Sequence, residues 1–330
     1  MKRTFFRIIA FFLPTRKLRN IVRRWGGPKT VKPNYFTQII NMISAIQDMS
    51  ELPMAKGFLR YIQLANLKVL YAFDKFAKTN NIKYFMIGGA ISGKIRHNDC
   101  VPWDDDMDIG MLSDDYEKMI KNIKDIIPNK HFDILFTSNV CRIIHADSKA
   151  FLDILRYDVY KTPYCYSPEN QAYLTQMFET FRTKKSDEKF LHFYLTANMN
   201  RKEIESCYEN VNKDFKRTRK IQKDVFSGIS GNYQTVFPMH ADCKIGEFYD
   251  YDTIFPIQRQ KFNKYILPFP NDVELYAAKC WGNIWAFPSD MFRTHEFTKD
   301  MSPAKLLALR QFNKLDDETV YEQFCKKDIL

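Results

Sequence analysis

The sequence has little glycine and proline, no acidic residue in its first 32 positions, and no long apolar run within them. Only 11 of the 330 residues are glycine and 14 are proline, whereas 45% are hydrophobic and 15% aromatic. Disordered chains contain fewer aromatic residues, and collagen-like or linker proteins contain far more glycine and proline. The composition therefore excludes those classes and indicates a globular protein with one large domain or two small ones.

The longest unbroken apolar run near the N-terminus, Ile8–Leu13, contains six residues. A membrane-spanning helix needs about 20, and Arg7 interrupts what would be the apolar core of a signal peptide. Instead, bulky apolar residues alternate with Arg and Lys over residues 1–32. This pattern is typical of a helix that lies on an anionic membrane surface. The alternatives are a basic helix packed on its own domain and a disordered start.

The net charge of +11 is concentrated in the same 32 residues. They contain ten Lys or Arg, so the remaining 298 residues carry 40 basic and 39 acidic side chains. A nearly neutral body argues against a nucleic-acid-binding surface on the folded domain. We therefore predict a membrane-associating tail, residues 1–32, in front of one catalytic domain, residues 33–330.

The seven cysteines are dispersed along the chain, and no two have the CxxC spacing of a metal or redox site. An odd, scattered set without a secretion signal indicates reduced thiols in the cytosol. Together with the basic tail, this predicts a cytoplasmic protein that lies peripherally on the inner face of a bacterial-type membrane.

The spacing of apolar residues predicts a mixed α/β (α+β) fold, in which helices flank a sheet and a helical insertion covers about residues 161–235. Helices are expected over 54–79, 113–127, 271–281 and 303–314, and within the insertion over 170–182, 186–197 and 201–225. Strands are expected over 84–87, 107–112, 132–136, 140–144, 151–160 and 262–267.

Four carboxylates occupy five positions at Asp104, Asp105, Asp106 and Asp108. Apolar residues flank the cluster on both sides, which indicates partial burial, and clustered buried carboxylates usually coordinate a hard cation. Alternate residues of a strand share a face. Asp106 and Asp108 would therefore project together, joined by Asp104 if the strand begins early, and Asp105 would point the other way. A solvated acidic turn is the alternative.

Three kinds of metal site compete for these acids. An EF-hand loop needs glycine at its sixth position, but Ile109 stands there, so that interpretation fails. A glycosyltransferase that uses nucleotide sugars also has an Asp-x-Asp motif, and this reading stays open. The third is a nucleotidyltransferase-like site, with a Gly-Gly turn shortly before the acids and another acid on a later strand.

Gly88-Gly89 and Asp153 fit the third interpretation. A turn of two glycines lets backbone N–H groups approach phosphate oxygens without interference from Cβ atoms. Asp153 stands alone between apolar pairs on a predicted strand, where an acid needs a partner. That partner is either the metal or the basic residue of a structural salt bridge.

The stretch from Gly88 to Gly110 closely resembles the LicD family of phosphocholine transferases and fukutin-related proteins. The resemblance is carried by a Gly-Gly turn, then Gly93, Arg96-His97 and the run Pro102-Trp103-Asp-Asp-Asp-Met-Asp108. Weaker similarity extends it around Asp153 and over residues 245–290. One departure is Lys94, where the family commonly has a small residue.

This resemblance implies a nucleotidyltransferase-like fold that transfers a phospho-alcohol from a CDP-activated donor to a sugar hydroxyl of a cell-surface glycan or lipid-linked glycan. Phosphocholine from CDP-choline is the default group, with ethanolamine, glycerol and ribitol phosphates still open. It also implies a Mg²⁺ or Mn²⁺ site. The metal ligands expected from the family motif are Asp104, Asp106, Asp108 and Asp153, and Asp153 is either a ligand or the general base.

The same resemblance assigns phosphate or substrate binding to Gly88, Gly89, Gly93, Arg96 and His97. Arg suits bidentate contact with phosphate, and His97 could donate a hydrogen bond to it. For both side chains the alternative is ordinary solvation at a helix end. Two other functions remain as rivals: a metal-dependent glycosyltransferase, and a membrane-associated binding protein without activity.

Overall fold

The computed structural model describes residues 48, 51–137, 139–163, 175, 176, 179, 180, 193–226, 231–239, 248–285 and 301–326. The predicted membrane-associating tail, residues 1–32, lies outside this set. The helices are α4 (Gly57–Thr79), α5 (Gly89–His97), α6 (Ser113–Ile123), α8 (Arg201–Phe226), α9 (Tyr251–Ile254), α10 (Val273–Trp281), α11 (Pro303–Lys314) and α12 (Asp317–Cys325). The strands are β1 (Phe85–Met86), β2 (Asp108–Leu112), β3 (Phe132–Phe136), β4 (Val140–His145), β5 (Phe151–Thr162), β6 (Phe193–Leu195), β7 (Tyr233–Pro238), β8 (Tyr249–Asp250), β9 (Gln258–Phe262) and β10 (Tyr265–Phe269).

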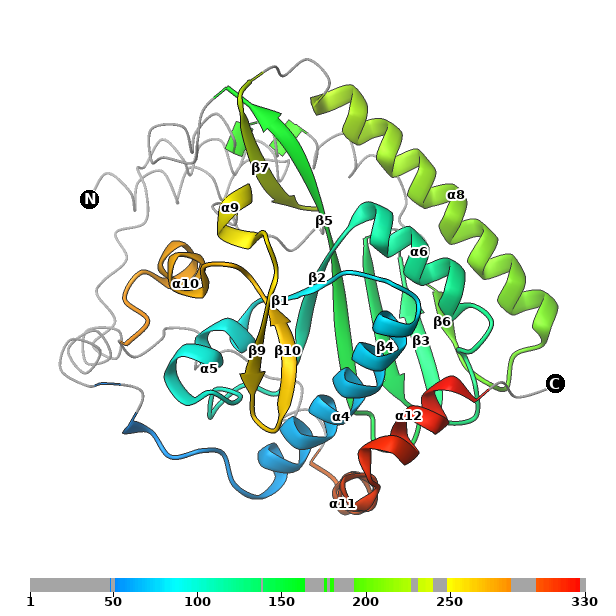
Figure 1. Cartoon of the computed structure of the whole chain (residues 1–330). Helices are drawn as coiled ribbons and strands as arrows, with labels where there is room; N and C mark the ends of the chain where they lie inside the picture. The colour runs from blue at the N-terminus through cyan, green and yellow to red at the C-terminus, as the bar shows by residue number, and fades with distance from the viewer. Residues whose placement is uncertain are drawn as a thin grey trace, which may run out of the picture. The chain divides into compact units, whose positions relative to one another are not determined.

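Strands β1 to β8 form one mixed sheet (Figure 1). Its main path runs β1-β2-β5-β4-β3-β6, while β7 pairs with β5 and β8. The β2–β5 pair is parallel, whereas the other pairs of this sheet are antiparallel. The predicted α/β class, a mixed sheet with flanking helices, is therefore confirmed.

The central strands have one face that is fully buried and one that is only half-buried. In β4 the two kinds alternate residue by residue, as the period of two requires. We call the half-buried side the carboxylate face, because Asp108, Asp153 and Arg142 are neighbours there on β2, β5 and β4. The opposite side, the covered face, carries Ile109, Ile154, Cys141, Ile143 and Ile134, all buried.

Helices pack on the covered face. Phe132 of β3 contacts Phe324 of α12, and His145 of β4 lies against Phe312 of α11. The ring of Tyr116 in α6 stacks on Phe215 of α8, which in turn lies under Arg156 of β5. In Figure 1 helices α4 and α6 lie in front of the sheet, so the carboxylate face is turned away from the viewer.

The described residues of the expected helical insertion, 161–235, include strands as well as helix. Helix α8 confirms its last helix. However, Phe193–Leu195 forms β6, which pairs with β3, so the prediction of helix over 186–197 is wrong at these three residues. The physical reason is tertiary: pairing at the sheet edge completes the hydrogen bonds of β3 and buries Leu195 completely.

After β8 the chain forms the β9–β10 hairpin, which contacts the end of α5. The β9–β10 hairpin was predicted only in its second half, and its turn residue Asn263 donates its backbone N–H to the carbonyl of Asn98 at 2.7 Å. The predicted helices over 271–281 and 303–314 are confirmed as α10 and α11. The hairpin thereby closes one side of the segment that carries the clustered aspartates.

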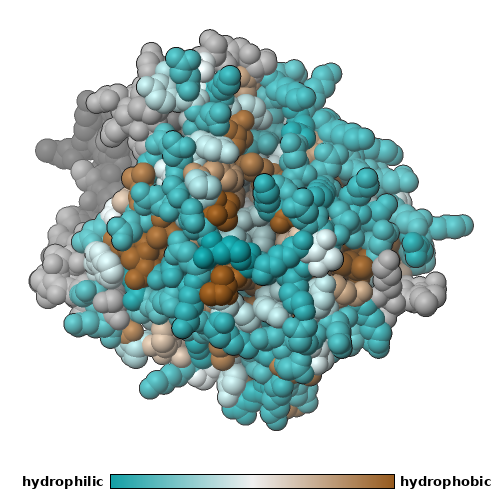
Figure 2. Space-filling model, viewed as in Figure 1, coloured by the Kyte–Doolittle hydropathy of each residue, from teal (hydrophilic) through white to brown (hydrophobic). Residues whose placement is uncertain are grey.

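The surface on the side of the covering helices is mostly hydrophilic, with only scattered brown patches in Figure 2. No helix among the described residues is both long and apolar enough to cross a lipid bilayer.

Candidate active site

The clustered aspartates lead into the first strand of the carboxylate face. Asp104 and Asp106 lie in the irregular segment before β2, and Asp108 is the first residue of β2. Asp105 is buried with 2% exposure, whereas Asp104, Asp106 and Asp108 are half-buried. This alternation fits the prediction that Asp104, Asp106 and Asp108 share one side and Asp105 points to the other.

The two glycines after β1 lie directly against these carboxylates. Gly88 has a φ of +59°, and a Cβ atom on it would lie 3.1 Å from Oδ2 of Asp108. A Cβ atom on Gly89 would lie 1.8 Å from Oδ2 of Asp104, which is sterically impossible without displacing that carboxylate. The Gly-Gly turn is therefore required by the close approach of the acids, and contact with phosphate stays a prediction.

Negative charge is concentrated around Asp104. Burial raises the pKa of Asp104 well above its ordinary value, and the carboxylates of Asp106, Asp108 and Asp105 raise it further. A hydrogen bond with Asp106 contributes to the same upward shift of the pKa. Carboxylates forced together in this way share protons or take up a cation.

These residues fit a divalent cation by charge and donor chemistry. A hard cation prefers carboxylate oxygens, and it would relieve the repulsion that raises the pKa of Asp104. Within the described part of the chain, however, no three His, Cys, Asp or Glu side chains are already arranged to hold an ion. Binding would therefore draw the carboxylates together rather than fill a finished cage.

Asp153 lies beside Asp108, as the resemblance implied. It is paired with Asp108 across the parallel strands β2 and β5, and its backbone N–H donates to the carbonyl of Met107 at 2.9 Å. Residues paired across neighbouring strands point to the same face. The sequence-based expectation that a later strand brings a further acid to the cluster is thus matched by the sheet register.

Arg142 is a residue of this site that sequence reasoning missed. Its Nε and Nη2 atoms donate to the two carboxylate oxygens of Asp153, each at 2.6 Å. The pair joins the two interpretations of Asp153, because the acid lies next to Asp108 and is also in a salt bridge. The available signal was a single arginine inside the otherwise apolar strand 140–144, antiparallel to the strand of Asp153.

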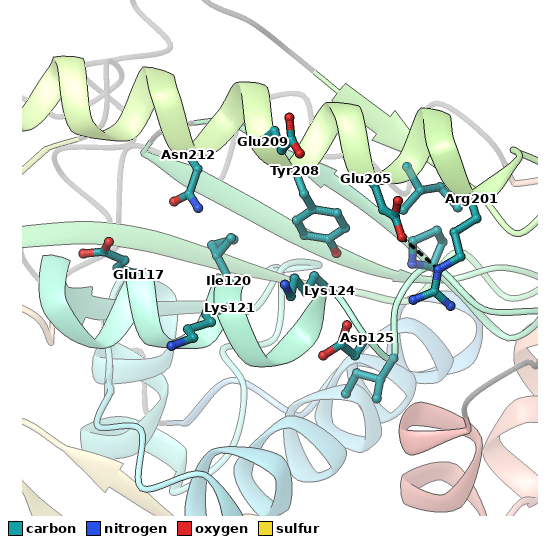
Figure 3. Close-up of a pocket in the computed structure, with 13 residues that line it drawn as sticks. Glu117, Ile120, Lys121, Lys124, Asp125, Arg201, Glu205, Tyr208, Glu209 and Asn212 are labelled. Carbon is teal, nitrogen blue, oxygen red and sulfur yellow. Dashed lines mark hydrogen bonds and ion pairs between the residues drawn. The ribbon is translucent and has the colours of Figure 1, made fainter.

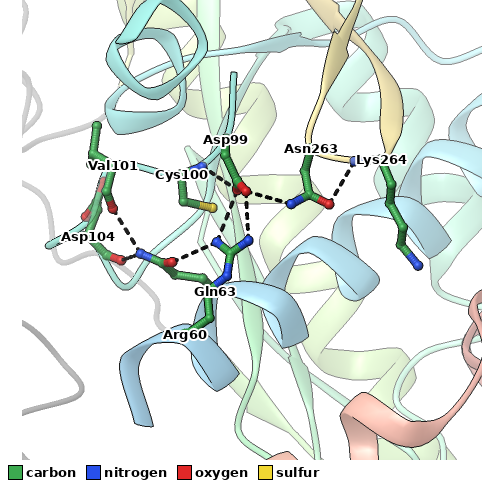
Figure 4. Close-up of polar contacts among 8 residues, drawn as sticks. All are labelled: Arg60, Gln63, Asp99, Cys100, Val101, Asp104, Asn263 and Lys264. Atoms are coloured by element: carbon green, nitrogen blue, oxygen red, sulfur yellow. Dashed lines mark hydrogen bonds and ion pairs between the residues drawn. The ribbon is translucent and has the colours of Figure 1, made fainter. Parts of the chain in front are cut away.

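Helix α4 supports the acidic segment from behind (Figure 4). Gln63 donates through Nε2 to the backbone carbonyls of Val101, at 2.9 Å, and Asp104, at 2.8 Å. Asn66, one turn later, donates to the carbonyl of Asp105 and accepts the N–H of Phe151. Both buried amides hold the acidic segment against α4, and Asn66 also ties it to the start of β5. They could have been noticed as polar residues within an otherwise apolar helical stretch.

An ion pair anchors the other end of the same segment. Arg60 donates to both carboxylate oxygens of Asp99, at 3.2 and 2.7 Å, and Asn263 donates to Asp99 at 2.7 Å. The pKa of Asp99 is lowered: burial acts to raise it, but the hydrogen bonds from Arg60, Asn263 and the N–H of Cys100 outweigh that effect. The segment therefore has a fixed entry point as well as fixed carbonyls.

The remaining predicted residues, Gly93, Arg96 and His97, lie on α5. A Cβ atom on Gly93 would lie 2.2 Å from the carbonyl oxygen of Asp99, so this glycine serves close packing. The guanidinium of Arg96, which is buried, lies 5.7 Å from the ring centre of Trp103. Burial, helped by Arg96, lowers the pKa of His97. Their predicted contacts with substrate stay predictions.

A separate cavity of about 400 Å³ lies between α6 and the first half of α8 (Figure 3). Its lining includes Lys121, Lys124, Glu205 and Tyr208, and the hydroxyl of Tyr208 donates to the carbonyl of Ile127. None of the predicted site residues lines it. The cavity is thus separate from the carboxylates of β2 and β5.

Comparisons with known proteins match the part of the chain that contains these residues. Residues 81–204 match the family described as LicD/FKTN/FKRP, nucleotidyltransferase domain. The lipopolysaccharide cholinephosphotransferase LicD of Haemophilus influenzae is 39% identical over 67 residues, which cover 20% of this chain and 25% of that protein. An uncharacterized protein of Rickettsia typhi is 33% identical over 102 residues, covering 28% of this chain and 32% of the relative.

A similar protein of Rickettsia prowazekii is 29% identical over 101 residues, or 27% of this chain and 38% of the relative. The chain thus spans between 25% and 38% of the length of these curated relatives. The segment that matches the family contains the Gly-Gly turn, the clustered aspartates, Arg142 and Asp153. Residues 81–204 of the chain are therefore similar to the nucleotidyltransferase domain of the LicD family.

Proposed function

We propose that this protein transfers a phospho-alcohol from a CDP-activated donor to a sugar hydroxyl of a cell-surface glycan, such as lipopolysaccharide or capsule. Phosphocholine is the default group, because one curated relative is named as a lipopolysaccharide cholinephosphotransferase. Ethanolamine, glycerol and ribitol phosphates are the other candidates for the transferred group.

One observation carries this proposal. Gly88 and Gly89 lie against Asp108 and Asp104, and Asp153 of β5 pairs with Asp108 of β2, all within the residues that match the family. The carboxylates of Asp104 and Asp108 lie next to the backbone of Gly89 and Gly88. An anionic group bound at these glycines would be repelled by the two carboxylates unless a cation were bound with it. A diphosphate with a divalent metal supplies both.

The reaction breaks the phosphoanhydride linkage of the donor and forms a phosphate ester with the acceptor. The acceptor hydroxyl oxygen bonds to the phosphorus that carries the alcohol, the bond to the bridging oxygen breaks, and CMP leaves with the electron pair. Bound Mg²⁺ or Mn²⁺ would neutralise the charge that develops on the leaving phosphate. Asp104, Asp106 and Asp108 would hold that ion, and the geometry of the chain does the rest by positioning.

Asp153 has two roles to choose from in this scheme. Its place beside Asp108 suits a further ligand of the ion. The hydroxyl of the acceptor must also lose its proton, and a carboxylate next to the ion can accept it. A hydrogen-bond donor such as Arg142 fixes the orientation of Asp153 in either role.

The direct test is incubation of the full chain with CDP-choline or with UDP-sugars, each with Mg²⁺ and with EDTA. Release of CMP from CDP-choline, abolished by EDTA, is the expected result, measured by liquid chromatography with mass spectrometry. Hydrolysis of UDP-sugars alone would instead establish the glycosyltransferase alternative. If neither donor reacts and Asp108→Ala leaves cellular glycans unchanged, the protein is a binding protein without activity.

The basic tail, residues 1–32, would bring the enzyme to lipid-linked acceptors on the inner face of the membrane. Each basic side chain near an anionic surface contributes about 1 kcal/mol of attraction. Deleting these residues should move the protein from the membrane fraction to the supernatant and leave CMP release unchanged. Unaltered fractionation after the deletion would remove the tail from the scheme and leave the catalytic proposal standing.

A further inference from the structure

The ion pair between Arg142 and Asp153 is the closest charged contact to the clustered aspartates that the sheet register fixes. The planar guanidinium meets the carboxylate with two parallel hydrogen bonds of 2.6 Å. The ring of Phe151, two residues before Asp153, lies 4.1 Å from the guanidinium carbon. Arg142 is thus held by an aromatic ring as well as by the acid.

The position of Arg142 relative to Asp108 follows from the register. Asp108, Asp153 and Arg142 stand in one row across β2, β5 and β4. Neighbouring strands are about 4.8 Å apart, so the strand of Arg142 lies about 10 Å from that of Asp108. The Arg142 side chain is 31% exposed and that of Asp153 is 13% exposed. An arginine is therefore within reach of a ligand bound over Asp108.

Other bidentate arginine pairs in the chain are built differently. Asp74 accepts from Arg259 at 3.1 and 2.8 Å, but also from the hydroxyl of Tyr84 and from Lys78. Asp99 likewise accepts from Arg60, Asn263 and a backbone N–H. Among the described residues, the side chain of Asp153 has Arg142 as its one hydrogen-bond partner. A cation that binds Asp153 would therefore displace fewer hydrogen bonds than one that binds Asp74 or Asp99.

We propose that Arg142 is a phosphate-binding residue that Asp153 holds ready until the metal-bound diphosphate of the donor arrives. This inference rests on the proposed function. A guanidinium fork fits phosphate oxygens as well as it fits a carboxylate. The two hydrogen bonds from Arg142 engage both oxygens of Asp153, so a cation that binds this carboxylate competes with the guanidinium for them. The cation therefore takes Asp153, and Arg142 turns to a phosphate oxygen, so that charge stays balanced at each step.

The exchange predicts effects of opposite sign on two ligands. Removing the charge of Arg142 removes a competitor for Asp153, so a divalent cation alone should bind more tightly. The same change removes a contact to phosphate, so a diphosphate added with the cation should bind more weakly. A salt bridge with only a structural role would move neither affinity in this pattern.

The experiment titrates the full chain with Mn²⁺, followed by electron paramagnetic resonance, and then with inorganic pyrophosphate at saturating Mn²⁺. Arg142→Gln should bind Mn²⁺ about five- to tenfold more tightly and pyrophosphate at least about tenfold more weakly than the unmodified chain. The matched control is Arg259→Gln, which breaks a bidentate pair on a different carboxylate and should leave both affinities unchanged. Asp108→Asn reports on the metal site itself and should abolish Mn²⁺ binding.

The outcomes separate this inference from the proposed function. If the unmodified chain binds Mn²⁺ and Asp108→Asn does not, the metal site stands, and unchanged or weaker Mn²⁺ binding in Arg142→Gln overturns the inference alone. If the unmodified chain binds no Mn²⁺, the metal-dependent function itself fails. Should Arg142→Gln not fold, Arg142→Lys carries the test. Its single ammonium group cannot hold both oxygens, so Mn²⁺ binding should still tighten, and an unchanged affinity would refute the exchange.

Discussion

The two faces of the central sheet carry charged residues in different ways. On the carboxylate face, Asp108, Asp153 and Arg142 form a half-buried row. On the covered face, Arg156 follows Asp153 by only three residues of the same strand but has 0% exposure. It lies over the ring of Phe215 and donates to Gln222 at 3.0 Å, both from α8. The role of a charged residue in a strand therefore cannot be inferred until the face of the sheet on which it lies is known.

Burial has different consequences on the two faces. On the covered face it lowers the pKa of Arg156 and raises that of Asp158, and the attraction between the two groups opposes both shifts. Asp158 also accepts hydrogen bonds from Ser113 and Gln222, so the buried group is shared among β5, α6 and α8. On the carboxylate face, like charges gather around Asp104. The Arg156–Asp158 pair therefore stabilises the fold, whereas the carboxylates around Asp104 repel one another and are kept together by the rest of the fold.

The largest expected effect is on the carboxylate face. Asp108→Asn removes a charge that the proposed metal needs, so CMP release should fall by at least about 10³-fold. The free energy of unfolding should change by less than about 1 kcal/mol, because the substitution keeps the shape and reduces repulsion around Asp104. Activity assays and urea unfolding measure the two quantities. If Asp108→Asn instead lost much stability but kept its activity per folded molecule, Asp108 would have a structural role and not a catalytic one.

The covered face should respond in the opposite way. Arg156→Met leaves Asp158 buried without its nearest cation, which should cost about 3–5 kcal/mol in the free energy of unfolding. Mn²⁺ affinity per folded molecule should not change. The double variant Arg156→Met, Asp158→Leu should recover much of the lost stability, because no uncompensated charge is left. Equal losses in the single and double variants would show that packing, and not charge, determines the effect.

The sequence predicted the strands and acids of the carboxylate face, whereas the residues that it missed depend on how the strands pair. Runs of apolar residues predicted the strands of Asp108 and Asp153, and the Gly-Gly dipeptide predicted the turn before the clustered aspartates. Arg142 and Arg156 were missed because the face of a strand residue depends on which strands pair and in what register. The strand at 193–195 was missed for the same reason. The conformation of Phe193–Leu195 depends on pairing with β3, which the local sequence does not reveal.

A smaller effect is expected from Gly89→Ala, which tests how closely the Gly-Gly turn must approach the acids. The added Cβ atom would lie 1.8 Å from Oδ2 of Asp104, so that carboxylate must move. A displacement of about 1 Å at a reacting centre can cost about 10²-fold in rate, and we expect a loss of about 10- to 100-fold in CMP release. Gly57→Ala is the control, because its Cβ atom would meet nothing within 4 Å. Its φ of +60° gives it a stability cost of about 1 kcal/mol but no loss of activity.

The smallest effect concerns pH and the covered face. Burial lowers the pKa of His145 to about 4, against Phe132 and Phe312 and with Nδ1 hydrogen-bonded to Ser148. The unfolded chain binds this proton with a pKa of about 6.5, so the neutral ring stabilises the fold above that pH. This stability is lost as the pH falls toward 4. Between pH 8 and pH 5 the loss should be about 2 kcal/mol.

His145→Gln should remove this part of the pH dependence, which urea unfolding at pH 8, 6.5 and 5 would measure. Mn²⁺ affinity at constant pH should be the same in both proteins, because the substituted ring lies on the face opposite Asp108. If His145→Gln retained the full loss of stability between pH 8 and pH 5, the proton would be taken up elsewhere. The carboxylates around Asp104 could not explain such a loss. The raised pKa of Asp104 makes its protonation favour the folded state, so as the pH falls its contribution to stability has the opposite sign to that of a buried neutral histidine.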